Sequence, residues 1–183
     1  MKRWSDLENF DPLWAERAKA MAQLIPPQAR VIEFGAGRRE LESNLDRGCS
    51  YVAADLVDRG PGTIVLDLEV RPLPDLSAYN FDIAVFGGVL EYLSDVAGVI
   101  SWLAHQVPVC LASYECAGSA PGSLQRLLEI WRRASYGWVS TYTETELRDV
   151  FATGGFRCSA KNIAKTSDGN ISIFRFDRIG APP

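Results

Sequence analysis

One stretch decides the fold: Val31–Leu41, which reads VIEFGAGRREL. Up to Phe34 it is apolar except for Glu33, which is typical of a strand covered on both faces. Gly35 and Gly37 allow a sharp turn and a close approach of the backbone to a ligand. A helix that begins after such a turn presents free N–H groups and the positive end of its dipole. The stretch therefore predicts a strand, turn and helix that receive a nucleotide-like ligand.

This turn differs from a dinucleotide-binding fingerprint. The pattern G-x-G-x-x-G needs a third glycine where this chain has Glu40. Glu33 stands just before the first glycine, where a carboxylate repels a pyrophosphate and favours a cationic group. The residue chemistry thus indicates a ligand with an ammonium group rather than one with two phosphates. The alternative is an ordinary strand-to-helix turn with a solvated glutamate.

A second acid follows at the end of the next expected strand, Tyr51–Asp55. Ligands of open α/β sheets lie at the carboxyl ends of the strands. An acid about twenty residues beyond a glycine turn is suited to a ribose, because its two oxygens can accept from both hydroxyls. We therefore interpret Asp55 as a ribose-binding residue. The alternative is a cap of a turn or helix.

Length and composition indicate one globular domain. The chain has 183 residues, 47% hydrophobic and 23% charged, with a net charge of −4. This length supports one full core, and the acidic balance disfavours a nucleic-acid partner. Met1–Asp6 lacks the apolar run of a signal peptide, and no stretch has the length of a membrane span. Four scattered cysteines and one histidine disfavour a metal site, so we expect free thiols in the cytoplasm.

Strand and helix signals alternate along most of the chain. A leading helix is expected to open at Asp11-Pro12 and to stop before Pro26-Pro27. Further strands are expected over 51–55, 63–68, 81–86 and 107–112, and a hairpin over 156–163 and 171–176. Only Leu56–Gly62 separates the second strand from the third, which is short for a parallel crossover. Either the usual helix is missing there or the strand ends differ.

The segment 118–142 interrupts this alternation. Ser123 begins an amphipathic helix whose apolar residues are Leu124, Leu127, Leu128 and Trp131. We weigh three roles for it: a lid or acceptor wall, a helix packed on the domain, or a dimer contact. Thr143 and Glu146 then form a capping box that starts another helix.

The order and spacing of these motifs resemble the class I S-adenosylmethionine-dependent methyltransferases, in particular their small-molecule (type 11/12-like) branch. The resemblance runs from about Gln28 to Asp177. It implies an α/β fold, a Rossmann-like three-layer αβα sandwich around a mostly parallel seven-stranded sheet with a C-terminal antiparallel hairpin. It also implies one methyltransferase-like domain over 1–183, with 1–27 as an N-terminal helical cap and 118–142 as the inserted helix or lid.

The resemblance further implies S-adenosylmethionine as the cofactor and a site along four strand ends. The motif that receives the methionine end matches Glu33, Gly35, Ala36 and Gly37. The ribose acid matches Asp55, and the positions around the adenine match Leu56, Asp67 and Leu68. The turn whose carbonyl meets the methionine ammonium matches Gly87 and Gly88, followed by Val89–Tyr92. The chain departs from the family pattern at Arg39, where a small residue is usual, in the short 56–62 connection, and at Tyr92, where a histidine is common.

The expected reaction is in-line attack by a small-molecule acceptor on a sulfonium methyl group. A hydroxyl or protonated amine acceptor also needs a group that removes a proton. Glu115 and Tyr114 follow the fifth strand on the ligand side and are the first candidates, with Tyr92, His105 and Tyr142 after them. The alternatives are a cofactor-binding or partner-regulating domain without catalysis, and a nicotinamide-dependent dehydrogenase.

Overall fold

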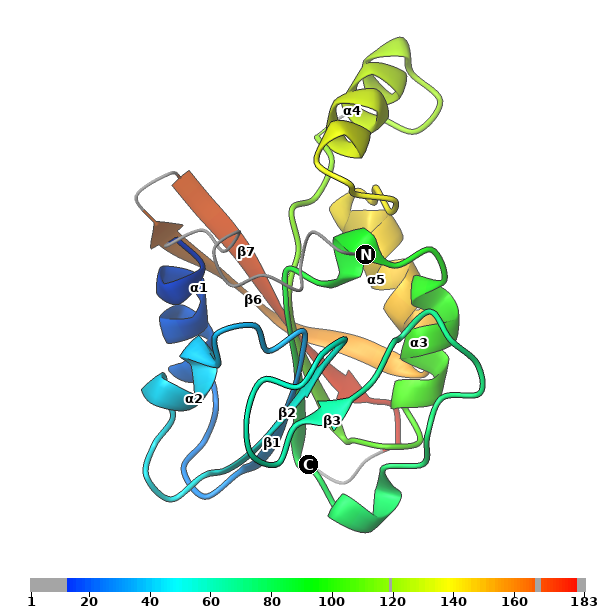
Figure 1. The fold of residues 1–183 in the computed structure, drawn as a ribbon. Coiled ribbons are helices and arrows are strands. Elements are labelled where there is room, and N and C mark those ends of the chain that lie inside the picture. Colours follow the sequence, from blue (N-terminus) through cyan, green and yellow to red (C-terminus); the bar gives the residue numbers. More distant parts are fainter. Residues whose placement is uncertain (1–12, 119, 167–168, 181–183) are drawn as a thin grey trace.

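The computed structural model describes residues 13–118, 120–166 and 169–180. Its strands form one seven-stranded sheet in the order β3-β2-β1-β4-β5-β7-β6 (Figure 1). Strands β1 to β5 are parallel, and β7 runs antiparallel to both β5 and β6. The strands are β1 (Arg30–Phe34), β2 (Ser50–Asp55), β3 (Ile64–Val65), β4 (Ile83–Gly87), β5 (Val109–Ser113), β6 (Phe156–Thr166) and β7 (Gly169–Arg178). This topology confirms the predicted α/β sheet with an antiparallel hairpin at its end.

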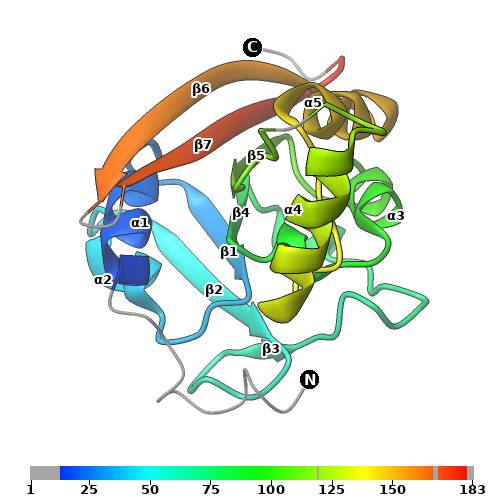
Figure 2. The ribbon, with the colours of Figure 1, turned by 90° about the horizontal axis from the view of Figure 1, so that it is seen from above.

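Helices cover both faces of the sheet (Figures 1 and 2). On one face lie α1 (Leu13–Ala22) and α2 (Glu40–Asn44), and on the other lie α3 (Val96–Leu103) and α5 (Glu144–Thr153). Helix α4 (Leu124–Ser135) stands beyond the carboxyl ends of the parallel strands, outside both layers. None of the helices in the described ranges has the length and hydrophobicity that a bilayer crossing requires.

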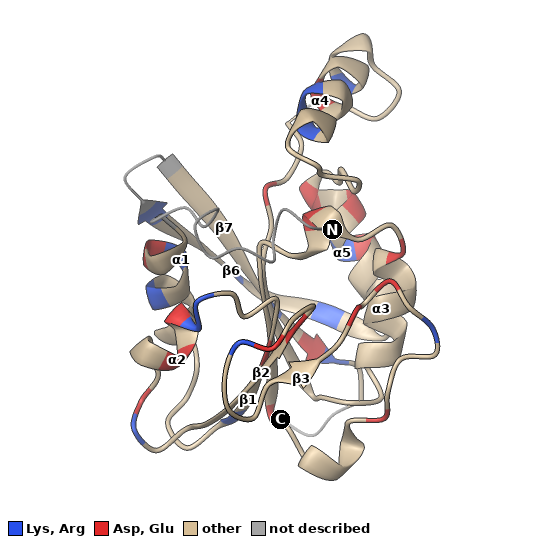
Figure 3. Cartoon of the chain, in the orientation of Figure 1, with Lys and Arg blue, Asp and Glu red and all other residues tan. Residues whose placement is uncertain are grey.

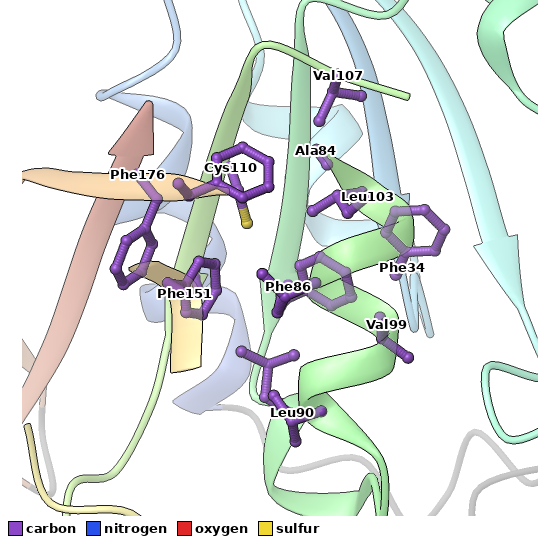
Figure 4. Close-up of a cluster of buried hydrophobic side chains, with 14 of the residues drawn as sticks. Phe34, Ala84, Phe86, Leu90, Val99, Leu103, Val107, Cys110, Phe151 and Phe176 are labelled. Carbon is purple, nitrogen blue, oxygen red and sulfur yellow. The ribbon is translucent and has the colours of Figure 1, made fainter. Parts of the chain in front are cut away.

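The pleat of the strands divides the apolar residues between two cores. Val31 pairs with Ile83, and the next residue pairs with Ala84, so neighbouring side chains point to opposite faces. Val31 and Ile83 pack beneath α1 and α2. The other core lies between the sheet and the helices α3 and α5, and its phenylalanines include Phe34, Phe86, Phe151 and Phe176 (Figure 4). Strand β1 is therefore held from both sides, which fixes the position of the glycine turn at its end.

The local helix signals are present where the sequence places them. The side chains of Asp95, Ser123 and Thr143 cap α3, α4 and α5 by accepting a hydrogen bond from a backbone N–H one turn further on. Glu146 completes the predicted capping box of α5. The Asp11-Pro12 signal for the leading helix lies outside the described residues.

The connection between β2 and β3 is a loop without a helix, which settles the two expectations for this region. The third strand, predicted over 63–68, is shorter than expected and contains Ile64 and Val65 only. Arg39 adopts the left-handed conformation at φ 58° and turns its guanidinium away from the cavity side of the turn, to Glu42 at 2.8 Å. It therefore does not crowd the glycine turn.

Candidate functional site

A cavity of about 390 Å³ opens at the carboxyl ends of β1, β2 and β4. In the sheet, β2 and β3 lie on one side of β1, and β4 and β5 lie on the other. The cavity therefore lies at the point where the direction of strand addition reverses. Helix α1 forms one wall, and Gly137 and Val139, which follow α4, form part of another. Figure 3 shows acidic and basic residues side by side in the loop between β2 and β3. The position and the mixed charge both indicate a binding site for a polar ligand.

The first glycine turn is held against β2. The N–H of Gly35 donates to the carbonyl of Ala54 at 2.8 Å, and the N–H of Gly37 donates to Oδ2 of Asp55 at 2.8 Å. Gly35 has a φ of 69°, and a Cβ at this residue would lie 2.5 Å from Cγ2 of Val89. Only glycine therefore allows the turn to approach the segment after β4. Gly35 and Ala36 line the cavity, whereas the N–H of Gly37 is taken by Asp55.

Asp55 stands at the end of β2 and lines the cavity, as predicted. Its Oδ2 is already engaged by Gly37 and by Nε of Arg59 at 3.2 Å, and both ion-paired side chains are buried. Its Oδ1 accepts a long hydrogen bond from the N–H of Val57 at 3.4 Å. Oδ1 is thus the oxygen best placed for an incoming hydroxyl. The ion pair with Arg59 could not be expected from the sequence, because an i, i+4 pair is a helix pattern and this segment is a loop.

Glu33 is buried on the α1 face of β1. The phenolic O–H of Tyr51 donates to its Oε2 at 2.5 Å. Burial raises the pKa of Glu33 to about 8, although the hydrogen bond from Tyr51 and the nearby charge of Arg17 oppose the rise. The carboxyl group is therefore protonated at neutral pH when no cation lies beside it. A ligand with an ammonium group would favour the charged form.

The second glycine turn, Gly87–Gly88, lies beneath the side chain of Arg17 from α1. A Cβ on Gly88 would lie 2.4 Å from Nη1 of Arg17, and Gly88 has a φ of 70°. Arg17 lines the cavity together with both glycines. Arg17 is a lining residue that sequence reasoning did not single out. The available signal was a single cation among the inward-facing residues of α1.

The remaining predicted cofactor residues lie at the other end of the cavity. Leu56, Asp67 and Leu68 all line it. Oδ1 of Asp67 accepts from the N–H of Glu69 at 2.9 Å, and Glu69 is a further lining residue that sequence reasoning did not single out. The structure thus brings together the residues expected around the adenine, although a helix is missing between β2 and β3.

Three of the five catalytic candidates, Tyr92, Tyr114 and Glu115, do not lie together. Tyr92 lines the cavity, and Nε1 of Trp138 donates to its hydroxyl oxygen at 2.9 Å. Tyr114 is buried away from the cavity lining, where its hydroxyl contacts Oγ of Ser140 at 3.1 Å, and burial raises its pKa to about 12. The carboxylate of Glu115 is exposed and lies 3.7 Å from Arg133. The geometry therefore favours Tyr92 over the other two.

Comparisons with known proteins agree with this arrangement. The family model described as a methyltransferase domain matches residues 6–161. No curated protein sequence matches the chain significantly. The fold is that of the Rossmann-like methyltransferase class. The chain belongs to the methyltransferase-domain family.

Solved structures with low sequence identity share the fold. The 1,6-didemethyltoxoflavin N1-methyltransferase of Burkholderia thailandensis, with its substrate and S-adenosylhomocysteine bound, is 18% identical with a TM-score of 0.65, over 92% of this chain and 80% of that one. Magnesium protoporphyrin IX methyltransferase of Synechocystis, with S-adenosylmethionine bound, is 14% identical with a TM-score of 0.63, over 97% and 90%. The mitomycin 7-O-methyltransferase is 16% identical with a TM-score of 0.68, over 94% and 56%. The chain thus spans little more than half of the mitomycin enzyme.

Proposed function

We propose that the chain transfers a methyl group from S-adenosylmethionine to a small-molecule acceptor by in-line displacement. One observation carries this proposal: Glu33 and Arg17 both line the cavity, Arg17 lies against the second glycine turn, and its charge is close enough to Glu33 to lower the pKa of that carboxyl group. A buried acid and a nearby cation match the ammonium and carboxylate groups of an amino acid. Asp55 lines the same cavity, at the position suited to a ribose.

The residues present fit this cofactor. Gly35 has no room for a Cβ beside Val89, and Gly88 lies directly against the guanidinium of Arg17, so the backbone lies close to the cavity on both sides of the methionine position. Arg17 would hold the carboxylate, Glu33 the ammonium, and Oδ1 of Asp55 a ribose hydroxyl. Leu56 and Leu68 would flank the adenine, with Asp67 toward its amino group. When bound, S-adenosylmethionine supplies a methyl group that is already activated for transfer.

The acceptor would lie at the end of the cavity bordered by Tyr92, Trp14, Gly137 and Val139. Nε1 of Trp138 donates to the hydroxyl oxygen of Tyr92, which holds this hydroxyl in place at the cavity wall, where it would orient an acceptor. Apolar and aromatic walls exclude water from the methyl group. They suit a small acceptor with a flat or apolar body.

A second candidate function is cofactor binding without catalysis, as in a partner-regulating relative. The position of Tyr114 and Glu115 favours it, because neither predicted proton acceptor lines the cavity. The two functions share the cofactor site and differ in turnover. Cofactor binding and product formation therefore need separate measurements.

The test is calorimetric titration with S-adenosylhomocysteine, followed by a screen of acceptors that detects its release from S-adenosylmethionine. Asp55→Asn removes a charged acceptor and should weaken binding at least about tenfold. Asp58→Asn is the matched control, because Asp58 lies in the same loop but its Oδ1 accepts from Gly60 and it does not line the cavity. Thermal unfolding of both variants checks the fold. Absence of binding to folded wild-type protein would overturn the proposal, and binding without turnover on any acceptor would favour the second candidate.

A further inference from the structure

Helix α4 turns its charged side toward the domain. Arg126 and Arg133 are buried, although they lie on the surface helix that stands furthest from the sheet. Nη2 of Arg126 lies 2.8 Å from Glu146 of α5, and Nη2 of Arg133 lies 3.0 Å from Glu129. Arg133 also donates to the carbonyl of Glu115 at 2.6 Å. The inward face of this helix is therefore fixed by ion pairs and hydrogen bonds.

The opposite face of α4 is apolar and exposed. Leu124, Leu127, Leu128 and Trp131 follow helical spacing and are 73%, 61%, 61% and 78% exposed. Ordinary amphipathic helices bury this stripe and expose their charges. Turning the stripe inward would break the ion pair between Arg126 and Glu146 and the hydrogen bond from Arg133 to the carbonyl of Glu115.

The exposed surface continues beyond the helix. We define the α4 outer face as the exposed apolar side chains of α4 and of the segment after it: Leu124, Leu127, Leu128, Ile130, Trp131, Tyr136 and Val139. Their exposed fractions correspond to an area on the order of 800 Å², whereas the largest patch of a typical monomer is about 300–600 Å². One partner of a standard protein interface contributes about 800 Å².

We propose that the α4 outer face binds the same face of a second copy of this chain. A two-fold interface places one patch against itself, which suits a stripe of leucines without an acidic residue. Arg132 is the exposed charged residue of α4 and lies at the margin of the stripe. A membrane surface is a weaker match, because interfacial helices expose a basic face beside the apolar one, whereas Arg126 and Arg133 are turned inward and the chain has a net charge of −4.

This interface would lie next to the cavity. Val139 belongs to the α4 outer face and also lines the cavity, and its N–H donates to the carbonyl of Glu91 at 2.8 Å. Glu91 immediately precedes Tyr92. A second copy would therefore steady the wall that we assign to the acceptor, a consequence that rests on the proposed function. The cofactor residues lie on β1, β2, β4 and α1, away from this face.

The test is the mass of the full chain in solution, measured by sedimentation velocity and light scattering over a range of concentrations without cofactor. We expect a dimer of the 20.2 kDa chain. Leu128→Glu should raise the dimer dissociation constant at least about a hundredfold, because each copy carries the substitution. Val70→Glu is the matched control, because Val70 is 60% exposed on a loop outside the α4 outer face and should leave the dimer unchanged.

Circular dichroism shows whether each variant folds, and Trp131→Ala provides a milder second variant in the same stripe. A wild type that is monomeric at every concentration would overturn the proposal. Binding of that monomer to neutral lipid vesicles would then indicate a membrane surface as the partner of this face. A dimer that Leu128→Glu and Trp131→Ala leave intact would also overturn it. Titration of the same variants with S-adenosylhomocysteine keeps the two proposals apart: cofactor binding by a monomeric Leu128→Glu variant supports the site independently of the dimer.

Discussion

Replacing Glu33 by glutamine should change how stability depends on pH. Burial raises the pKa of this carboxyl group from its ordinary value of about 4.5 to about 8. The folded state therefore holds the proton more tightly than the unfolded chain does. The resulting stabilisation is complete below about pH 4.5 and is lost as the pH rises to about 8. Glutamine keeps the acceptor for the hydroxyl of Tyr51 but has no proton to lose.

The size of the effect follows from the shift. A rise from about 4.5 to about 8 at about 1.4 kcal/mol for each pH unit gives a loss on the order of 5 kcal/mol across this range. Wild type and Glu33→Gln should be similar in stability near pH 4.5–5, and the variant should be the more stable protein above about pH 8. This is an upper value, because relaxation of the site around the charged carboxylate would reduce the shift.

Urea unfolding at several pH values, followed by tryptophan fluorescence, measures this difference. Other carboxyl groups titrate in the same range, so the informative quantity is the difference between the free energies of unfolding of wild type and variant at each pH. Asp149→Asn on the exposed side of α5 removes one charge without removing a buried carboxyl group and is the control. A difference between wild type and Glu33→Gln that stays constant from about pH 5 to about pH 8.5 would refute the reasoning.

Three further predictions concern the cofactor cavity. Arg17→Met should weaken binding of S-adenosylhomocysteine at least about tenfold in calorimetry. Binding of 5′-methylthioadenosine, which lacks the amino-acid group, should be unchanged, and equal losses of affinity for both ligands would contradict the carboxylate role. At about pH 7, S-adenosylhomocysteine should release protons from the wild type, because its ammonium favours charged Glu33. Titration in buffers of different ionisation enthalpy should show less release from Glu33→Gln, and equal release would argue against contact with Glu33. Gly35→Ala should lower the free energy of unfolding by about 1–3 kcal/mol, as measured by urea unfolding. The loss should exceed that of Gly62→Ala, because Gly62 has a similar φ of 78° but open space around it. Adding Val89→Ala should recover the part of the loss that comes from the clash with Val89, but not the part that comes from the backbone conformation.

The fold could be predicted from the sequence wherever one local signal was sufficient. The apolar run up to Phe34, the caps at Asp95 and Ser123 and the capping box at Thr143 each depend on residues close in the chain, and each is present. The short third strand could not be predicted in the same way. Its apolar run extends to Leu68, but only Ile64 and Val65 pair with β2. The loop that replaces the helix brings the chain to the sheet opposite Ala54, where β2 is about to end.

The site was predictable to the extent that strand ends define it. Acids and glycines that end β1, β2 and β4 meet at one edge of a parallel sheet, so Glu33, Asp55 and Gly87 converge as expected. Side chains that arrive from elsewhere were not predictable. Arg17 reaches the cavity from a helix that precedes the sheet, and the direction of the α4 stripe depends on where Arg126 finds its partner in α5. Such contacts depend on tertiary packing, which periodicity does not encode.

The two carboxyl groups that the cofactor would need also present a problem before it binds. Glu33 and Asp55 are both buried and line the same cavity, and the charge of Asp55 contributes to the raised pKa of Glu33. Two uncompensated buried carboxylates would be costly. The chain resolves this by leaving a proton on Glu33 and an arginine, Arg59, on Asp55. A ligand ammonium would take the place of the proton on Glu33. A ribose hydroxyl would donate to Oδ1 of Asp55 without displacing Arg59 from Oδ2. The ligand-free cavity is therefore close to neutral at these two groups, which allows it to keep its shape until a zwitterionic ligand supplies the missing charge.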